Sequence, residues 1–156
     1  MNSCNIRYGV LLLLAGVLLS CGKEEHKPFD QAFIHIMDNE ASTATVNYQA
    51  TVLRTYQVYL SSAPQTQAVD VEFRLVPGNG LREGVDYEVL TPGRILSFLP
   101  GIYDMPIRIR WLPSPAFDET KDNTLTIELV GNNRGITMGL PGPDQRQRAF
   151  VITKIR

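Results

Sequence analysis

The feature that most limits the possible folds of this chain is a strict two-residue alternation of apolar and polar side chains. In residues 69–76 (VDVEFRLV), every second side chain is apolar and the three between them are charged. In residues 105–112 and 124–130 every second side chain is again apolar. Successive side chains of a β-strand point to opposite faces, so this pattern buries one face and leaves the other in water. The chain is therefore expected to fold as β-sheet.

Turn-forming residues divide the chain from residue 32 onward into short strands. The expected strands are 32–37, 55–60, 69–76, 87–90, 94–98, 105–112, 124–130 and 149–155, and residues 43–48 are a β-branched stretch that leads into the second of them. Residues 77–80 (PGNG) break the chain with residues that tolerate positive φ, and 131–143, rich in Gly and Pro, is expected to be a long loop. No stretch after residue 21 shows a sustained helical period with caps. These signals predict an all-β fold, a single immunoglobulin-like, antiparallel Greek-key sandwich of about seven to eight strands.

The N-terminus carries a different pattern, an apolar run over residues 10–19 that ends in Leu18-Leu19-Ser20-Cys21. A helix over this run would be about 15 Å long, half the thickness of a bilayer core, so it is typical of an export signal rather than a membrane span. Residues 18–21 resemble the lipobox of bacterial lipoproteins, whose cysteine receives a diacylglycerol. We expect a signal peptide at 1–20, lipidated Cys21 and a tether at 21–31, and the β-domain at 32–156. An ordinary signal peptide with an incidental cysteine is the alternative.

The residues after Cys21 bear on where the protein is displayed. Gly22-Lys23-Glu24-Glu25 is similar to the surface-export signal of Bacteroidota-type lipoproteins. That resemblance implies a lipid-anchored protein of the outer membrane that is exposed on the cell surface. Attachment that faces the periplasm is the alternative.

Charge and cysteine content narrow the expected partners. The chain has 15 basic and 16 acidic residues, which are interspersed, so nucleic acid is not an expected partner. Cys4 would leave with the signal peptide and Cys21 would be acylated, so the fold is expected to hold without a disulfide. The expected partners are the membrane, through Cys21, and an envelope protein or a glycan.

A series of short motifs in residues 52–155 resembles a known domain family. The alternating strand VDVEF is followed by a Gly-Asn-Gly turn, by Gly84-Val85-Asp86-Tyr87, by a Pro100-Gly101 turn and by a strand with alternating isoleucines. After a long loop come another alternating strand, Gly135-Ile136-Thr137-Met138-Gly139 and a terminal strand. The order and spacing resemble the Calx-β domain and related small domains of Bacteroidota-type surface lipoproteins. The resemblance implies a Greek-key sandwich of seven to eight strands.

The resemblance also raises the question of calcium. Calcium-binding members of the family use acidic clusters at one end of the sandwich, but their paired aspartates match Leu112-Pro113-Ser114 here. Calcium takes six to eight oxygen ligands. The acidic residues that could still gather near one end are Asp86, Asp118, Glu119 and Asp122. We expect no metal and no cofactor, and we expect Asp86 and Tyr87 to serve the fold.

The sequence contains little that could catalyse a reaction. His35 is the one histidine in an expected strand, with no nucleophile-elbow motif nearby, so an enzyme is not expected. Tyr59 and Tyr103 are the candidate binding residues, because exposed aromatic side chains offer flat apolar area with a polar tip. The sequence therefore predicts a non-catalytic, protein- or glycan-binding accessory module on the cell surface. A structural or adhesive envelope component and a calcium-dependent binding domain are the alternatives.

Overall fold

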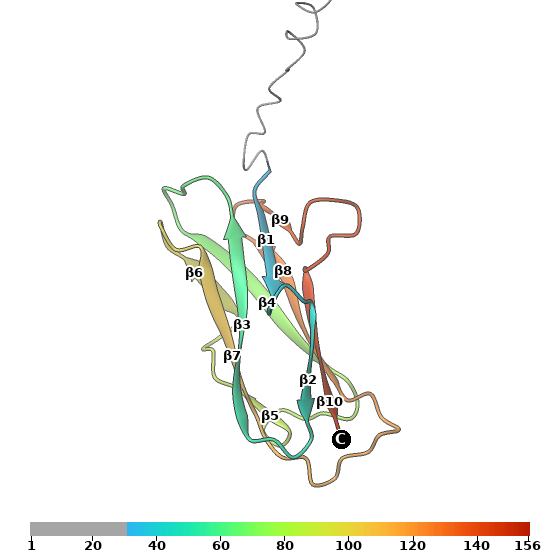
Figure 1. The fold of residues 1–156 in the computed structure, drawn as a ribbon. Coiled ribbons are helices and arrows are strands. Elements are labelled where there is room, and N and C mark those ends of the chain that lie inside the picture. Colours follow the sequence, from blue (N-terminus) through green and yellow to red (C-terminus); the bar gives the residue numbers. More distant parts are fainter. Residues whose placement is uncertain (1–30) are drawn as a thin grey trace, which may run out of the picture.

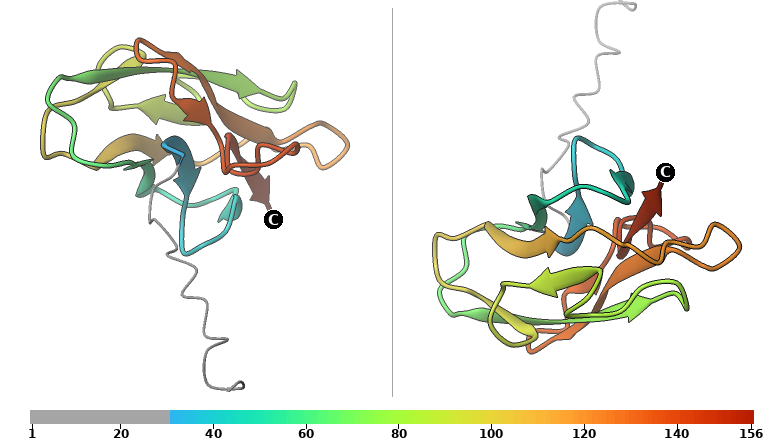
Figure 2. Two further views of the ribbon diagram at one scale, coloured as in Figure 1. Left: turned by 90° about the horizontal axis from the view of Figure 1, so that it is seen from above. Right: turned by 90° about the horizontal axis from the view of Figure 1, so that it is seen from below.

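The computed structural model describes residues 31–156, which form two β-sheets packed face to face (Figures 1 and 2). The ten strands are β1 (Phe33–Met37), β2 (Thr43–Asn47), β3 (Val52–Ser61), β4 (Val69–Pro77), β5 (Tyr87–Val89), β6 (Ile95–Phe98), β7 (Asp104–Trp111), β8 (Thr124–Asn132), β9 (Thr137–Met138) and β10 (Ala149–Ile155). The first sheet has the order β5-β7-β3-β1-β9 and the second the order β2-β10-β8-β4-β6. The predicted all-β sandwich is confirmed. The predicted signal peptide, Cys21 and the tether as far as residue 30 lie outside the described residues.

The structure corrects the number and the pairing of the strands. There are ten strands in two five-stranded sheets, where about seven to eight were predicted. The predicted loop 131–143 contains the end of β8 and the whole of β9, which pairs with β1 in parallel. β2 also pairs in parallel, with β10, so the sandwich is not wholly antiparallel. β9 has only two residues, too few for alternation to reveal it.

The core lies between the sheets, where the alternation placed it. Seventeen apolar or aromatic strand residues are at most 1% exposed: Ile34, Ile36, Tyr56, Val58, Val69, Val71, Phe73, Tyr87, Phe98, Ile107, Ile109, Trp111, Leu125, Ile127, Leu129, Phe150 and Ile152. Trp111 donates its Nε1–H to the Tyr56 hydroxyl at 3.0 Å, and burial raises the pKa of Tyr56 to about 12. Each sheet therefore has an apolar inner face, and its outer face is left for contacts with other molecules.

The two ends of the sandwich differ in the loops that they carry. We call the end where residue 31 lies the N-terminal end and the end where Arg156 lies the C-terminal end. Figure 1 shows that β1 and then β2 both run in the direction from the N-terminal end to the C-terminal end. The loop of residues 112–123 lies at the C-terminal end, and the loop of residues 139–148 lies at the N-terminal end. Within residues 31–156 there is no helix with the length and apolar character needed to cross a bilayer.

Candidate functional site

Three ring side chains form a row on the outer face of the first sheet. β1 and β3 pair with His35 opposite Tyr59, and alternation places Phe33 on the same face as His35. The ring centroids of His35 and Tyr59 are 5.4 Å apart with 23° between the ring planes, and those of Phe33 and His35 are 5.3 Å apart. We call Phe33, His35 and Tyr59 the aromatic row.

Polar groups lie within and beside the aromatic row. His35 is only 7% exposed, and burial lowers the pKa of its imidazole. Its Nδ1 and the Oε1 of Gln57 are buried and have no hydrogen-bond partner among residues 31–156. Asp104 lies opposite Tyr59 on β7 and is exposed. The row therefore combines flat apolar area with an unpaired ring nitrogen, an amide oxygen and a carboxylate.

The buried imidazole predicts a loss of stability in acid. The pKa of His35 is lowered in the folded chain, so below about pH 6.5, the ordinary value, the unfolded chain binds a proton that the folded chain does not. The free energy of unfolding should therefore fall as the pH drops from 7.5 to 5.5. His35→Phe keeps a ring in the row and should lose less stability over this range than the wild type. Urea unfolding at both pH values measures the difference, and equal losses in the two proteins would contradict the prediction.

The structure separates the two tyrosines that the sequence singled out. Tyr59 is half-buried in the aromatic row. The Tyr103 carbonyl accepts a hydrogen bond from the Leu60 N–H at 2.8 Å, and the Tyr103 side chain packs against the core. Tyr59 therefore remains the candidate on an outer face, whereas Tyr103 lies with the core residues.

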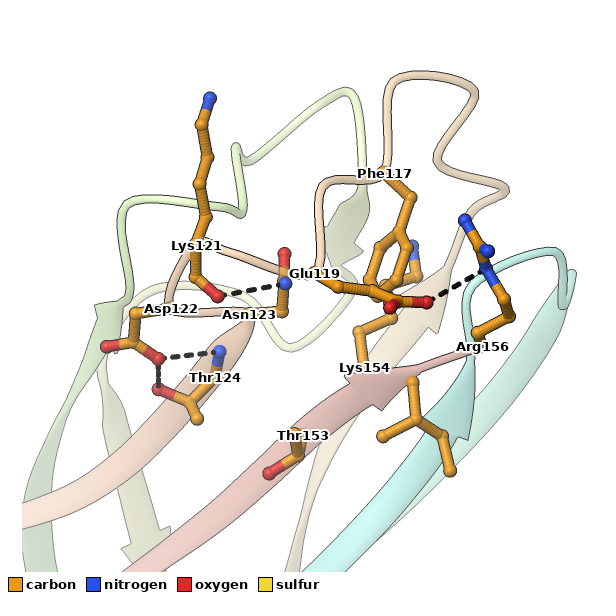
Figure 3. Close-up of a pocket in the computed structure, with 10 residues that line it drawn as sticks. Phe117, Glu119, Lys121, Asp122, Asn123, Thr124, Thr153, Lys154 and Arg156 are labelled. Carbon is orange, nitrogen blue, oxygen red and sulfur yellow. Dashed lines mark hydrogen bonds and ion pairs between the residues drawn. The ribbon is translucent and has the colours of Figure 1, made fainter.

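A pocket of about 410 Å³, the end pocket, lies at the C-terminal end of the sandwich (Figure 3). Residues of the loop before β8 line one side, and residues 153–156 line the other. The Phe117 ring packs against Tyr48 at 5.0 Å, and Glu119 pairs with Arg156 at 2.9 Å. Lys121 extends away from the other labelled side chains in Figure 3. The pocket combines one aromatic ring with one ion pair, Glu119 with Arg156, and with the exposed ammonium group of Lys121.

A buried ammonium group lies beside the end pocket. Lys154 is 1% exposed, and its Nζ donates hydrogen bonds to the Asp86 carbonyl at 3.0 Å, to Ser114 Oγ at 2.7 Å and to the Leu112 carbonyl. Burial lowers the pKa of Lys154, and the Asp86 carboxylate opposes this shift. Leu112 and Ser114 belong to residues 112–114, where the sequence resemblance implied that calcium-binding Calx-β domains carry paired aspartates. At this position the Lys154 ammonium group places a positive charge against these residues.

The four acidic residues considered for calcium do not converge on one point. Asp86 is 4% exposed, and its carboxylate accepts hydrogen bonds from the Arg82 N–H and the Ser114 hydroxyl. The other three bind within or beside their own loop, Asp118 to Thr120, Glu119 to Arg156 and Asp122 to Thr124. The hydrogen bonds from Thr120 lower the pKa of Asp118. Over residues 31–156 no group of three or more metal-ligating side chains is found.

Sequence reasoning missed Lys154 and the part that Phe33 plays in the aromatic row. A signal for Lys154 was present, because it takes the third inward position of a strand whose first two are Phe150 and Ile152. A cation in an apolar register indicates a buried polar partner. Phe33 gave no such signal, because the row also requires Tyr59, which a separate strand places against His35.

Comparison with known proteins bears on the fold. No protein-family model and no curated protein matches the chain. Among solved structures, the calcium binding domain CBD12 of CALX1.1 matches with a TM-score of 0.55 and 20% identity, over 80% of this chain and 44% of that one. The Bacteroides thetaiotamicron protein EndoBT-3987, in complex with a Man5GlcNAc product, matches with a TM-score of 0.50 and 12% identity, over 79% of this chain and 31% of that one. This chain therefore corresponds to less than half of either matched chain. The likeness shows a Calx-β-like β-sandwich.

Proposed function

We propose that this protein is a lipid-anchored, surface-displayed module of the outer membrane that binds a glycan through the aromatic row and catalyses no reaction. The observation that carries the proposal is the contiguous placement of Phe33, His35 and Tyr59 on one outer face. Sugar rings have apolar faces and polar edges, and an aromatic ring with nearby hydrogen-bonding groups complements both. Asp104 and Gln57 supply such groups beside Tyr59.

The polar atoms of the row support a glycan as the ligand. The exposed Asp104 carboxylate beside Tyr59 can accept hydrogen bonds from sugar hydroxyls. The buried Nδ1 of His35 and Oε1 of Gln57 lack partners, and they could bind a hydroxyl group only if the side chains that cover them moved. The fold likeness to EndoBT-3987, which was crystallised with Man5GlcNAc, makes that oligosaccharide a reasonable first ligand to test. The row offers surface for binding rather than groups for reaction, because His35 packs against two rings.

The binding part of the proposal is tested by removing the tyrosine ring at one end of the aromatic row. Tyr59→Ala should weaken binding of the recognised glycan at least about tenfold, because truncating an aromatic anchor commonly costs more than 1.4 kcal/mol. Leu53→Ala is the matched control, since Leu53 is 53% exposed on the outer side of the same strand and lies away from the row. A glycan array that includes Man5GlcNAc identifies the ligand, and calorimetry compares the variants. Equal affinity in both variants, or no glycan bound by the wild type, would reject the aromatic row as a glycan site.

The anchoring part of the proposal depends on Cys21, which lies outside the described residues. Two acyl chains hold a protein on a membrane stably, whereas one does so only marginally. A clickable palmitate analogue should label the wild type and leave Cys21→Ser unlabelled. Protease added to intact cells should digest the wild type if the protein faces outward, and protection from the protease would favour the alternative that faces the periplasm.

A further inference from the structure

β2 leaves an open edge on the second sheet. It stands last in the strand order, and among residues 31–156 it pairs only with β10. The Val151 N–H donates to the Ser42 carbonyl at 3.0 Å, and the Tyr48 N–H donates to the Ile155 carbonyl at 2.7 Å. Backbone groups alternate sides along a strand, so residues 42, 44, 46 and 48 face β10. Thr43, Thr45 and Asn47 therefore turn their N–H and C=O groups to the free edge, and all three residues are exposed. The Asn47 carbonyl already accepts a hydrogen bond from the Ala50 N–H at 3.0 Å, so only its second lone pair is left for a partner.

This edge lacks the features by which proteins usually protect a sheet edge. Natural edge strands are kept very short, or carry charges, proline or a bulge. The other three edge strands are short, with three residues in β5, four in β6 and two in β9. β2 is the longest at five residues, and its sequence TATVN contains no charge and no proline. Its pairing with β10 also runs without a register shift.

We propose that a second copy of this chain pairs with β2, antiparallel across a two-fold axis that passes through Thr45. In this register, Thr45 lies opposite Thr45 of the second copy, and Thr43 lies opposite Asn47 of the second copy. The three outward-facing residues of each strand then exchange N–H···O=C bonds with their opposites. The second sheets of both copies become one continuous sheet.

The chemistry of β2 fits a second copy as the partner. A two-fold contact brings the same surface against itself, so any charge would meet its own kind. The side chains on β2 are uncharged, and a threonine opposite a threonine is a favourable cross-strand pair. If the two-fold axis ran along the strands, the two β2 strands would be parallel and each N–H would face the same N–H of the second copy. No hydrogen bonds could form in that arrangement, so the antiparallel arrangement is the one that remains. The two chains then enter the dimer at opposite ends, because β2 runs away from the N-terminal end (Figure 1).

Cysteine crosslinking of the full chain tests both the contact and its register. Residues opposite each other in a hydrogen-bonded antiparallel pair have Cα atoms about 5.5 Å apart, within the span of a disulfide. Thr45→Cys should therefore form a covalent dimer on mild oxidation of the detergent-extracted protein. Thr43→Cys is the matched control, on the same exposed strand, because its two copies would lie about 13 Å apart, beyond the reach of a disulfide. The wild type, which has Cys4 and Cys21 but no cysteine in β2, is the control for crosslinks through those two residues.

A second variant tests the contact without a crosslink. Thr45→Lys sets two ammonium groups against each other and should reduce the sedimentation mass of the wild-type dimer to that of a monomer, with the melting temperature of the monomer retained. A wild type that sediments as a monomer, or a Thr43→Cys protein that crosslinks as readily as Thr45→Cys, would overturn the proposal. The test is independent of glycan binding, so each of the two proposals stands or falls by itself.

Discussion

Replacing Lys154 with methionine is expected to lower the free energy of unfolding by at least about 3 kcal/mol, because each buried acceptor left without its donor costs about 1–3 kcal/mol. Methionine keeps the apolar stem but leaves the Asp86 and Leu112 carbonyls and Ser114 Oγ without their ammonium donor. The Asp86 carboxylate, on a residue that is 4% exposed, also loses a nearby positive charge, although its ion pair with Arg82 at 3.7 Å remains. Urea unfolding measures the loss, and the fluorescence of Trp111, the single tryptophan, reports on this end of the core.

Lys121→Met is the control for this substitution. Lys121 is exposed and takes part in no ion pair within residues 31–156, so its loss should change the stability by less than about 0.5 kcal/mol. The same unfolding curves recorded with added calcium test the calcium-binding alternative, because a cation that binds only the folded chain must stabilise it. With the Lys154 ammonium in place, we expect calcium to leave the wild-type curve unchanged. A small effect of Lys154→Met would show that the three acceptors are satisfied in another way.

The fold class could be predicted from the sequence because the pattern that indicates it, the alternation of apolar and polar side chains, lies within short stretches of the chain. The alternation in residues 69–76 and 105–112 depends on neighbouring residues alone, and both stretches are strands whose apolar side faces the core. Burial of one face is a strong physical constraint, since a shift of one residue would expose every apolar side chain of the strand. For the same reason Trp111 could be placed in the core.

The candidate sites could not be predicted, because they depend on contacts between distant parts of the chain. Lys154 binds Ser114 across 40 positions and Asp86 across 68. The aromatic row depends on the register that sets His35 against Tyr59, which neither strand specifies alone. The turn at residues 77–80 shows the same limit. It was explained by positive φ, but neither Gly78 nor Gly80 has a positive φ. The structure requires Gly78 for another reason, since a Cβ there would lie 2.3 Å from the Asp122 carbonyl oxygen.

At Gly139 both reasons for glycine coincide. Its φ is +85°, and a Cβ would lie 2.3 Å from the Gln145 carbonyl oxygen. The Gly139 N–H donates to the Ile34 carbonyl at 2.7 Å, and the Ile36 N–H donates to the Gln147 carbonyl at 2.8 Å, so both ends of this loop are fastened to β1. A side chain at Gly139 would push the returning part of the loop away from the sheet.

Gly139→Ala is therefore expected to destabilise the fold by roughly 2–5 kcal/mol, since the left-handed backbone costs an alanine about 1–2 kcal/mol and overpacking adds about 1–3 kcal/mol. Gly101→Ala separates the two contributions, because Gly101 has a φ of +86° and no atom within 4 Å of its Cβ position. It should lose only the backbone part in urea unfolding. Hydrogen exchange at the Ile36 amide should accelerate in Gly139→Ala and not in Gly101→Ala, because only the first variant displaces the Gln147 acceptor. Equal losses in both variants would mean that the loop moves aside without cost, and that backbone conformation alone requires glycine at residue 139.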